Sequence, residues 1–272
     1  MGSMLVRVLG FPATLIHGDP LVLDRWLWLK KRLPSPTNGE NLIDVGCGTG
    51  AFTIGAALRG YKSLGLSWDD RNQSVARERA LICKAPSAKF EVFDVRKLDQ
   101  RKDLFSKFDI ALSFENIEHI LDDRKLMKDI AKCLKPGGRL LLTTPNDKYR
   151  PISAHDAGPF SPIEDGRHVR KGYNEERLIE LCNDAGLDFQ SCSFCSGFLS
   201  QKLAYLLRLV ASIHPLFAWA VILPFRILPP IFDPLISKLN LWPQYSICLE
   251  ANKPSPANND ALARTGVPDL DD

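Results

Sequence analysis

The chain has 272 residues, of which 45% are hydrophobic and 25% charged, and its formal net charge is +3. This is the composition of an ordinary globular protein, long enough for one large domain or two small ones. Basic residues alternate with acidic ones along the whole length, so no basic stripe stands out and we expect no nucleic-acid partner. The seven cysteines are scattered and no secretory signal precedes them, which predicts a reducing, cytoplasmic setting.

The two ends of the chain are set aside from the expected fold. Residues 1–4 resemble a cloning remnant, so the domain is expected to start at Met4. Residues 254–272 are rich in Pro, Asn, Ala and Asp and carry almost no large apolar side chains, so they cannot offset their own ordering entropy. We therefore expect a single domain over residues 4–253, followed by a disordered tail at 254–272.

The first expected element is a helix within residues 19–33, where Asp19 and Pro20 precede spaced leucines and tryptophans and Pro34 ends the pattern. Short apolar runs then alternate with helix-length segments, which is typical of a parallel sheet covered by helices. A further helix is expected at 174–185, ending at Gly186. The seven strands of this α/β sheet are expected at 41–45, 63–67, 89–94, 108–114, 139–143, 187–195 and 244–250.

The segment 198–242, between the last two expected strands, is dense in Leu, Ile, Phe and Pro. Its longest charge-free stretch, 209–225, is near the minimum length of a membrane span, but His214, Pro215 and Pro224 argue against one. We expect an inserted pair of helices. Three roles stay open for it: packing as core, a lid over an apolar substrate, or a peripheral membrane contact.

Cys192 and Cys195 form a C-x-x-C pair in an alternating, strand-like stretch. Residues three apart in a strand point to opposite faces, which argues against joint redox or metal work. We expect no metal site.

The strongest chemical signal is the loop after the first expected strand, residues 44–50 with the sequence DVGCGTG, followed by an Ala-rich helix at 51–58. Glycines let the backbone turn sharply and approach a ligand closely, and the helix points its N-terminal amides at that ligand. Gly46, Gly48 and Ala51 also fit the G-x-G-x-x-A variant of the dinucleotide fingerprint. Spacing by itself therefore leaves an NAD-dependent oxidoreductase open.

Asp44, placed two residues before the first glycine, and the unbroken GCGTG resemble the first signature of the class I S-adenosylmethionine (SAM) dependent methyltransferases. Three later segments fall where that family has motifs: FDV at 93–95, ENIEH at 115–119 and LKPGG at 134–138. The second is similar to the E-x-x-E-H segment of the quinone and other small-molecule methyltransferases. The resemblance covers about residues 37–251. It implies a doubly wound sheet with its last strand antiparallel, helices on both faces, and SAM as cofactor with S-adenosylhomocysteine as product.

The resemblance also implies roles for single residues. Asp94 would accept from the adenine amino group, with a helix-capping role as the alternative. Ser67 stands where relatives usually carry an acidic ribose ligand, and Asp69 is the alternative ribose partner. Trp68 either stacks on adenine or is merely buried. The candidate cofactor residues are Asp44, Gly46, Cys47, Gly48, Gly50, Ser67, Trp68, Asp69, Asp94, Val95, Glu115 and His119.

The candidate catalytic bases are His119, His155 and His168. Methyl transfer is an in-line displacement on an activated donor, so positioning supplies much of the catalysis and a base helps with a hydroxyl or carbon acceptor. A structural role is the alternative for His119, and bracing of the substrate loop is the alternative for His168, whose surroundings resemble the H-x-[RH]-x-[FY] stretch of quinone-type enzymes.

Residues 113–116 (SFEN) lack the [DN]-P-P-[YF] pattern of enzymes that methylate DNA bases. We therefore expect a SAM-dependent methyltransferase that acts on an O, C or N atom of a small hydrophobic metabolite, such as a quinone, an isoprenoid or a secondary metabolite. A non-catalytic SAM-binding module is a further alternative. The location is expected to be cytoplasmic, with membrane association through 198–242 as one interpretation of that segment.

Overall fold

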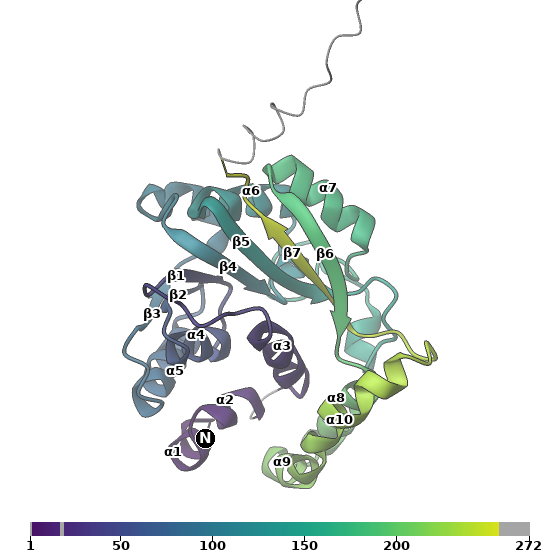
Figure 1. The fold of residues 1–272 in the computed structure, drawn as a ribbon. Helices are drawn as coiled ribbons and strands as arrows, with labels where there is room; N and C mark the ends of the chain where they lie inside the picture. The colour runs from purple at the N-terminus through teal and green to yellow at the C-terminus, as the bar shows by residue number, and fades with distance from the viewer. Residues whose placement is uncertain (1, 17–18, 256–272) are drawn as a thin grey trace, which may run out of the picture.

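A computed structural model describes residues 2–16 and 19–255 of the chain (Figure 1). Its centre is a seven-stranded sheet with the order β3-β2-β1-β4-β5-β7-β6. β7 is antiparallel to β5 and β6, and the other neighbouring strands are parallel. The doubly wound sheet with an antiparallel last strand is confirmed. The strands are β1 (Asn41–Val45), β2 (Lys62–Ser67), β3 (Ala88–Val92), β4 (Phe108–Phe114), β5 (Leu134–Pro145), β6 (Asp188–Cys195) and β7 (Ser246–Asn252).

β2 and β6 each start one residue away from the expected position, and three other strands differ more. β3 ends at Val92, because Asp94 leaves the strand and caps the short 3-10 helix η1 (Val95–Gln100). β5 is much longer than 139–143, because it pairs with β4 on one side and with β7 on the other. β7 begins two residues later than expected, at Ser246, and continues to Asn252.

Helices cover both faces of the sheet. One face packs against η1, α6 (Asp123–Cys133) and α7 (Glu175–Ala185), and the other against α3 (Leu21–Lys30), α4 (Ala51–Leu58) and α5 (Asp70–Ile82). Short 3-10 turns, η2 (Lys102–Leu104), η3 (Ile117–His119) and η4 (Ala154–Ala157), lie in the connections. The expected helices of the sheet region are therefore present.

Two short helices, α1 (Gly2–Leu9) and α2 (Phe11–Ile16), precede α3 and were not predicted. Phe11 packs edge-on against Trp26 of α3, with ring centroids 5.1 Å apart. Gly55 of α4 makes room for that contact, since a Cβ there would lie 2.4 Å from the Trp26 ring. The helix α1 includes residues of the expected cloning remnant, and most of the expected disordered tail, 256–272, lies outside the described residues.

The hydrophobic helical insert before the last strand is confirmed, although the segment between β6 and β7 contains three α-helices and not a pair. They are α8 (Phe198–Ala211), α9 (Pro215–Ile222) and α10 (Leu228–Ser237), with the 3-10 turn η5 (Leu223–Ile227) before α10. Prolines near the start of α9, η5 and α10 divide the apolar segment, because proline is tolerated in a first helical turn but interrupts a helix interior. α8 packs on the sheet domain through its buried Ser200, Gln201 and Ala204.

Candidate cofactor and catalytic site

The glycine loop lies at the carboxyl ends of β1 and β4, which are neighbours in the sheet. The chain order runs outward in opposite directions from this pair, and ligands of open α/β sheets bind in the crevice at such a point. Two adjoining cavities open there, of about 380 and 720 Å³. We name them the Ser67 cavity and the Arg25 cavity after one lining residue of each. Gly46, Gly48, Asn72 and Glu115 line both.

The three glycines of the loop have positive φ angles for different reasons. A Cβ on Gly46 would lie 2.4 Å from Cγ of Asn116, and one on Gly50 would lie 2.6 Å from the Phe90 ring, so both fit tightly against the protein itself. Gly48, with φ +51°, has no heavy atom within 4 Å of such a Cβ. Gly48 is therefore the position at which a ligand can approach the backbone.

Asp44 and Cys47 are both buried. Oδ2 of Asp44 accepts a 2.7 Å hydrogen bond from Oγ1 of Thr53 in α4, and burial raises the pKa of Asp44 to about 6. Asp44 is not among the residues that line either cavity. Cys47 lines the Arg25 cavity, and burial raises the pKa of its thiol. Asp44 thus anchors the loop to α4, and Cys47 is a poor nucleophile.

The residues after β2 divide between the two cavities. Ser67 and Trp68 line the Ser67 cavity, and Trp68 is 66% exposed, so the buried alternative for Trp68 is wrong. Asp69 lines the Arg25 cavity, and its Oδ1 accepts from the backbone N–H groups of Arg71 and Asn72 at 2.8 and 3.2 Å. Asp69 therefore caps α5, and that cap places Asn72, a residue that sequence reasoning missed, at the junction of the cavities.

Asp94 lines the Ser67 cavity with its carboxylate already engaged. Arg96 donates from Nε and Nη2 to Asp94 at 2.8 and 2.7 Å, and this pairing holds the pKa of Asp94 below its usual value. The capping alternative for Asp94 is therefore realised. Nη1 of Arg96 also donates to Glu164, whose Oε1 accepts from the backbone of Leu121. These bonds fasten the loop after β5 over the cavity, next to the buried Val95.

A buried ion pair at the other cavity joins α3 to the end of β4. Nη2 of Arg25 lies 3.0 Å from Oε2 of Glu115, and both residues line the Arg25 cavity. Ser246, the first residue of β7, accepts from Nε of Arg25 at 3.3 Å and donates to Oε1 of Glu115 at 3.0 Å. Burial alone would lower the pKa of Arg25, but the charges of Glu115 and Asp19 raise it. Sequence reasoning missed Arg25, and the available signal was the charged pair Asp24-Arg25 within a mostly apolar helix.

Glu118, His119 and His168 form a second polar cluster, beside the Ser67 cavity. Burial and the charge of Glu115 raise the pKa of the fully buried Glu118, whose Oε1 lies 3.9 Å from Nε2 of His119. The imidazoles of His119 and His168 meet edge to face, with centroids 4.7 Å apart. Burial and the neighbouring His119 lower the pKa of His168 to about 4, so its ring is neutral at physiological pH. His119 lines the cavity.

The ligand atoms of Glu118, His119 and His168 lie within 4.8 Å of one another, a spacing that would admit a divalent cation and that the sequence had not indicated. Sequence reasoning had included His119 and His168 but not Glu118. The backbone of the third histidine candidate, His155, lies in η4, and its side chain is outside what the structure describes.

The stretch around His168 also has the bracing role that was its alternative. The N–H of Val169 donates to the carbonyl of Glu118 at 2.9 Å. Nη2 of Arg170 donates to the carbonyls of Ile120 and Leu121 at 2.8 Å, and its Nη1 pairs with Asp123. These contacts hold the segment after β4 in place.

Comparison with known proteins agrees with this geometry. A family model described as a methyltransferase domain matches residues 23–191. Ubiquinone biosynthesis O-methyltransferases from Leptothrix cholodnii and Idiomarina loihiensis are 25% identical over 176 residues and 31% identical over 108 residues. These matches cover 63% and 40% of this chain, and 72% and 43% of the two relatives, so the second match spans less than half of that relative.

Solved structures share the fold. The geranyl diphosphate methyltransferase in complex with SAM has a TM-score of 0.56 at 18% identity, and the alignment covers 84% of each chain. The [4+2]-cyclase SpnF has a TM-score of 0.60 at 19% identity, covering 93% of this chain and 96% of that one. The family match sets aside the dinucleotide alternative that the glycine spacing had left open. With the family model spanning more than half of its residues, the chain belongs to the class I SAM-dependent methyltransferases.

Proposed function

We propose that this protein transfers the methyl group of SAM to a hydroxyl oxygen of a small apolar acceptor, such as a phenol or hydroquinone with an apolar tail. The observation that carries the proposal is the arrangement around Gly48. The buried Arg25–Glu115 pair lies on one side, in the Arg25 cavity, and His119 lies on the other, in the Ser67 cavity. One end of this site suits a zwitterion, and the other offers a group that can accept a proton.

The residues present fit SAM. The amino-acid end of SAM carries a carboxylate and an ammonium, which match the guanidinium of Arg25 and the carboxylate of Glu115. The nucleoside end would lie in the Ser67 cavity, where Ser67 and Asn72 offer hydrogen bonds and the exposed Trp68 offers a flat apolar face. Asp94 could accept from the adenine only by sharing its carboxylate with Arg96.

SAM supplies a methyl group on a sulfonium, already activated for displacement. The protein has to orient the acceptor oxygen and remove its proton. We assign the proton to the imidazole of His119, because His119 lines the cavity, and Glu118 lies close enough to stabilise the resulting imidazolium. The proton of the acceptor hydroxyl would pass to His119 as the oxygen takes the methyl group that SAM would supply. His168 packs against the ring of His119 in an edge-to-face contact, and His155 stays a candidate for contact with the acceptor.

The choice of an apolar acceptor is supported by the named activity of the relatives and by the apolar insert, whose helix α8 contacts α3, the helix that carries Arg25, and whose helix α10 lines a cavity with α3. We propose that residues 4–253 form one domain in which 198–242 is an insert, and that this insert makes a peripheral membrane contact. A location on the cytoplasmic side of a membrane would give such an enzyme access to a hydrophobic metabolite.

Calorimetry with SAM, S-adenosylhomocysteine and NADH tests the cofactor assignment, and an acceptor series of hydroquinones with lengthening alkyl chains tests the reaction, with products identified by mass spectrometry. We expect both SAM and its product to bind, NADH not to bind, and O-methylated products to increase with chain length. SAM binding without any methylated product would favour the non-catalytic module. A methyl group found on carbon would overturn the assignment of a hydroxyl acceptor.

A further inference from the structure

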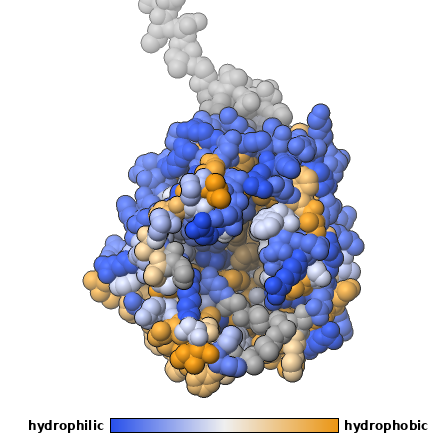
Figure 2. Space-filling model, turned by 180° about the vertical axis from the view of Figure 1, so that it is seen from behind, coloured by the Kyte–Doolittle hydropathy of each residue, from blue (hydrophilic) through white to orange (hydrophobic). Residues whose placement is uncertain are grey.

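Exposed apolar side chains are concentrated in one part of the molecule. More than half of the large hydrophobic residues that are exposed among residues 2–16 and 19–255 lie in the insert 198–242. α1 adds Met4, Val8 and Leu9. Figure 1 places α1 and α8 to α10 at the same end of the molecule, and Figure 2 shows hydrophobic residues gathered at that end below a hydrophilic upper surface. Patches of this kind mark contact surfaces.

The helix α8 has an unusual outward face. Its buried side consists of Ser200, Gln201 and Ala204, whereas Leu209 and the nearby Ile213, which is 83% exposed, face solvent. The apolar side of an ordinary surface helix faces the core and its polar side faces water. The outward face of α8 therefore suits contact with an apolar surface outside the protein.

The charges on the insert have one sign at the surface. Its single carboxylate, Asp233, is buried and accepts from the N–H groups of Leu199 and Ser200 at 2.8 and 3.0 Å. Lys202 and Lys238 are exposed and have no carboxylate partner among the described residues. Nζ of Lys202 lies 4.3 Å from the centre of the Trp242 ring. Basic side chains beside tryptophan and exposed aliphatic residues suit the interface of an anionic bilayer.

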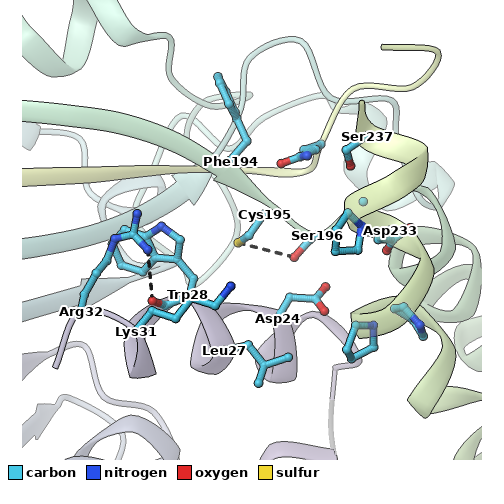
Figure 3. A pocket seen from close by; sticks show the side chains of 15 residues that line it. Asp24, Leu27, Trp28, Lys31, Arg32, Phe194, Cys195, Ser196, Asp233 and Ser237 are labelled. Atoms are coloured by element: carbon cyan, nitrogen blue, oxygen red, sulfur yellow. Dashed lines mark hydrogen bonds between the residues drawn. The ribbon is translucent and has the colours of Figure 1, made fainter. Parts of the chain in front are cut away.

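Part of the insert passes a length and composition test for a membrane span, at Phe217–Ser237. The charged residues of this stretch, however, contact the rest of the protein. Asp233 caps α8, and it lines a cavity of about 260 Å³ with Asp24 and Trp28 of α3 (Figure 3). Arg226 is buried near Asp19 and Asp24. A span would have to break these contacts and carry both charges into lipid, which favours a helix that lies on the membrane.

We infer that the outer faces of α8, α9 and α10 dock on the surface of an anionic lipid bilayer, with α1 as a smaller second contact. This face lies at the end of the molecule that holds the carboxyl edge of the parallel strands, which would shorten the path of an apolar acceptor from the bilayer to the site. That delivery role rests on the proposed methyl transfer, whereas the docking surface is argued from exposure and charge alone.

Vesicle flotation of the full chain tests the inference. The vesicles are pure phosphatidylcholine and an equal mixture of phosphatidylcholine and phosphatidylglycerol. We expect strong flotation only with the anionic mixture, and a fall in bound protein of about tenfold or more for the double variant Leu209→Gln/Ile213→Gln. The matched control is Leu81→Gln on α5, where the side chain is 79% exposed outside the patch, and this variant should float like the unaltered protein.

The charge contribution has its own pair of variants. Lys238→Gln should weaken binding to the anionic vesicles about fivefold, and Lys128→Gln, on the exposed side of α6, should leave it unchanged. Val8→Gln should have a smaller effect than Ile213→Gln.

Three outcomes would overturn the inference. They are no binding to the anionic vesicles, equal losses in Leu81→Gln and the double variant, and a protein that stays in the membrane after alkaline carbonate extraction. Sedimentation of the free protein must show a monomer, since a dimer dissociated by Leu209→Gln/Ile213→Gln would assign the face to a second copy of the chain. SAM affinity, measured by calorimetry on the same variants, should not change, so failure of docking is distinguishable from failure of the methyltransferase assignment.

Discussion

The crevice at the carboxyl ends of β1 and β4 and the insert 198–242 lie toward the same end of the molecule but differ in what they bury. The crevice buries charge: Arg25, Glu115 and Glu118 are removed from most or all solvent and held by specific partners. The insert exposes apolar side chains and keeps its one carboxylate inside. Burying a charge lowers the stability of the folded protein, and so does exposing Ile213 and its neighbours. Folding alone therefore explains neither feature. Each departure identifies a surface made for something outside the chain.

The largest effect expected in the crevice comes from Gly48→Val. The new side chain would occupy the open space at this glycine, so SAM affinity should fall about 1000-fold or more by calorimetry. Gly186→Val is the matched control, because Gly186 also has a positive φ and open space around its Cβ but lies at the end of α7. Both variants lose stability, and only the first should lose SAM. An unchanged affinity in folded Gly48→Val would move the cofactor elsewhere.

The next effect concerns chemistry instead of binding. His119→Gln should lower kcat about 100-fold while SAM affinity stays within a few-fold, because the imidazole accepts a proton without holding the cofactor. Single-turnover rates with a hydroquinone acceptor measure this. If kcat is unchanged and unfolding occurs at a lower temperature, His119 has only its structural role.

A smaller loss is expected from Arg25→Met, about tenfold to 100-fold in SAM affinity, since a charge-assisted contact is removed. The sharper measurement is the comparison with 5′-methylthioadenosine, which lacks the amino-acid end and should bind both proteins about equally. Arg32→Met is the control, because Arg32 follows α3 and pairs with Glu250 at 2.6 Å, away from both cavities. Equal losses for both ligands would mean that Arg25 supports the fold and not the zwitterion.

The contributions of His168 in the crevice and of Asp24 beside the insert to the free energy of unfolding should depend on pH with opposite sign. Burial lowers the pKa of His168 to about 4, so its contribution to stability is complete above pH 6.5 and is lost as pH falls toward 4. Burial raises the pKa of Asp24, against the insert, to about 7, so its contribution is complete below pH 3.8 and is lost as pH rises through 7. Each contribution should amount to about 1 kcal/mol, after a discount for partial exposure.

The free energy of unfolding, measured with denaturant across this pH range, reports both contributions. His168→Gln should flatten the acid side of the profile, and Asp24→Asn should flatten the neutral side. If Asp24→Asn is without effect between pH 5 and 8, the contact between α3 and the insert does not carry a buried proton.

The parts of the fold that follow from local pattern could be predicted from the sequence. Apolar runs located all seven strands, and the loop 44–50 with its neighbours indicated the family. Local capping explains some of the differences: Asp94 and Asp69 were considered as nucleotide ligands, but each accepts backbone N–H groups at the start of the next helix. A carboxylate after a strand is compatible with both roles until the helix start is known.

Other features depend on contacts between distant residues. Arg25 reaches Glu115 and Ser246 across separate elements, and Glu118 comes next to His168 because the loop after β5 folds back over the segment after β4. The residue periodicity of a single helix or strand cannot indicate contacts between elements so far apart in the sequence. For the insert, composition showed that it is apolar but not which side chains are outside, and the sequence therefore left core, lid and membrane contact open.

The position of β7 has a consequence for how the protein is made. Within residues 2–16 and 19–255, β6 pairs only with β7. β7 is the last of the described strands, although it lies between β5 and β6 in the sheet. During synthesis the ribosome therefore releases β6, and then the whole apolar insert, before the strand that joins them to the sheet exists. The five parallel strands can assemble first. Until β7 is made, the apolar insert stays exposed to solvent, because β6 has no strand with which to pair. A bilayer or a chaperone that binds the exposed insert during this time would prevent its aggregation. Translation close to a membrane should therefore improve the yield of folded protein.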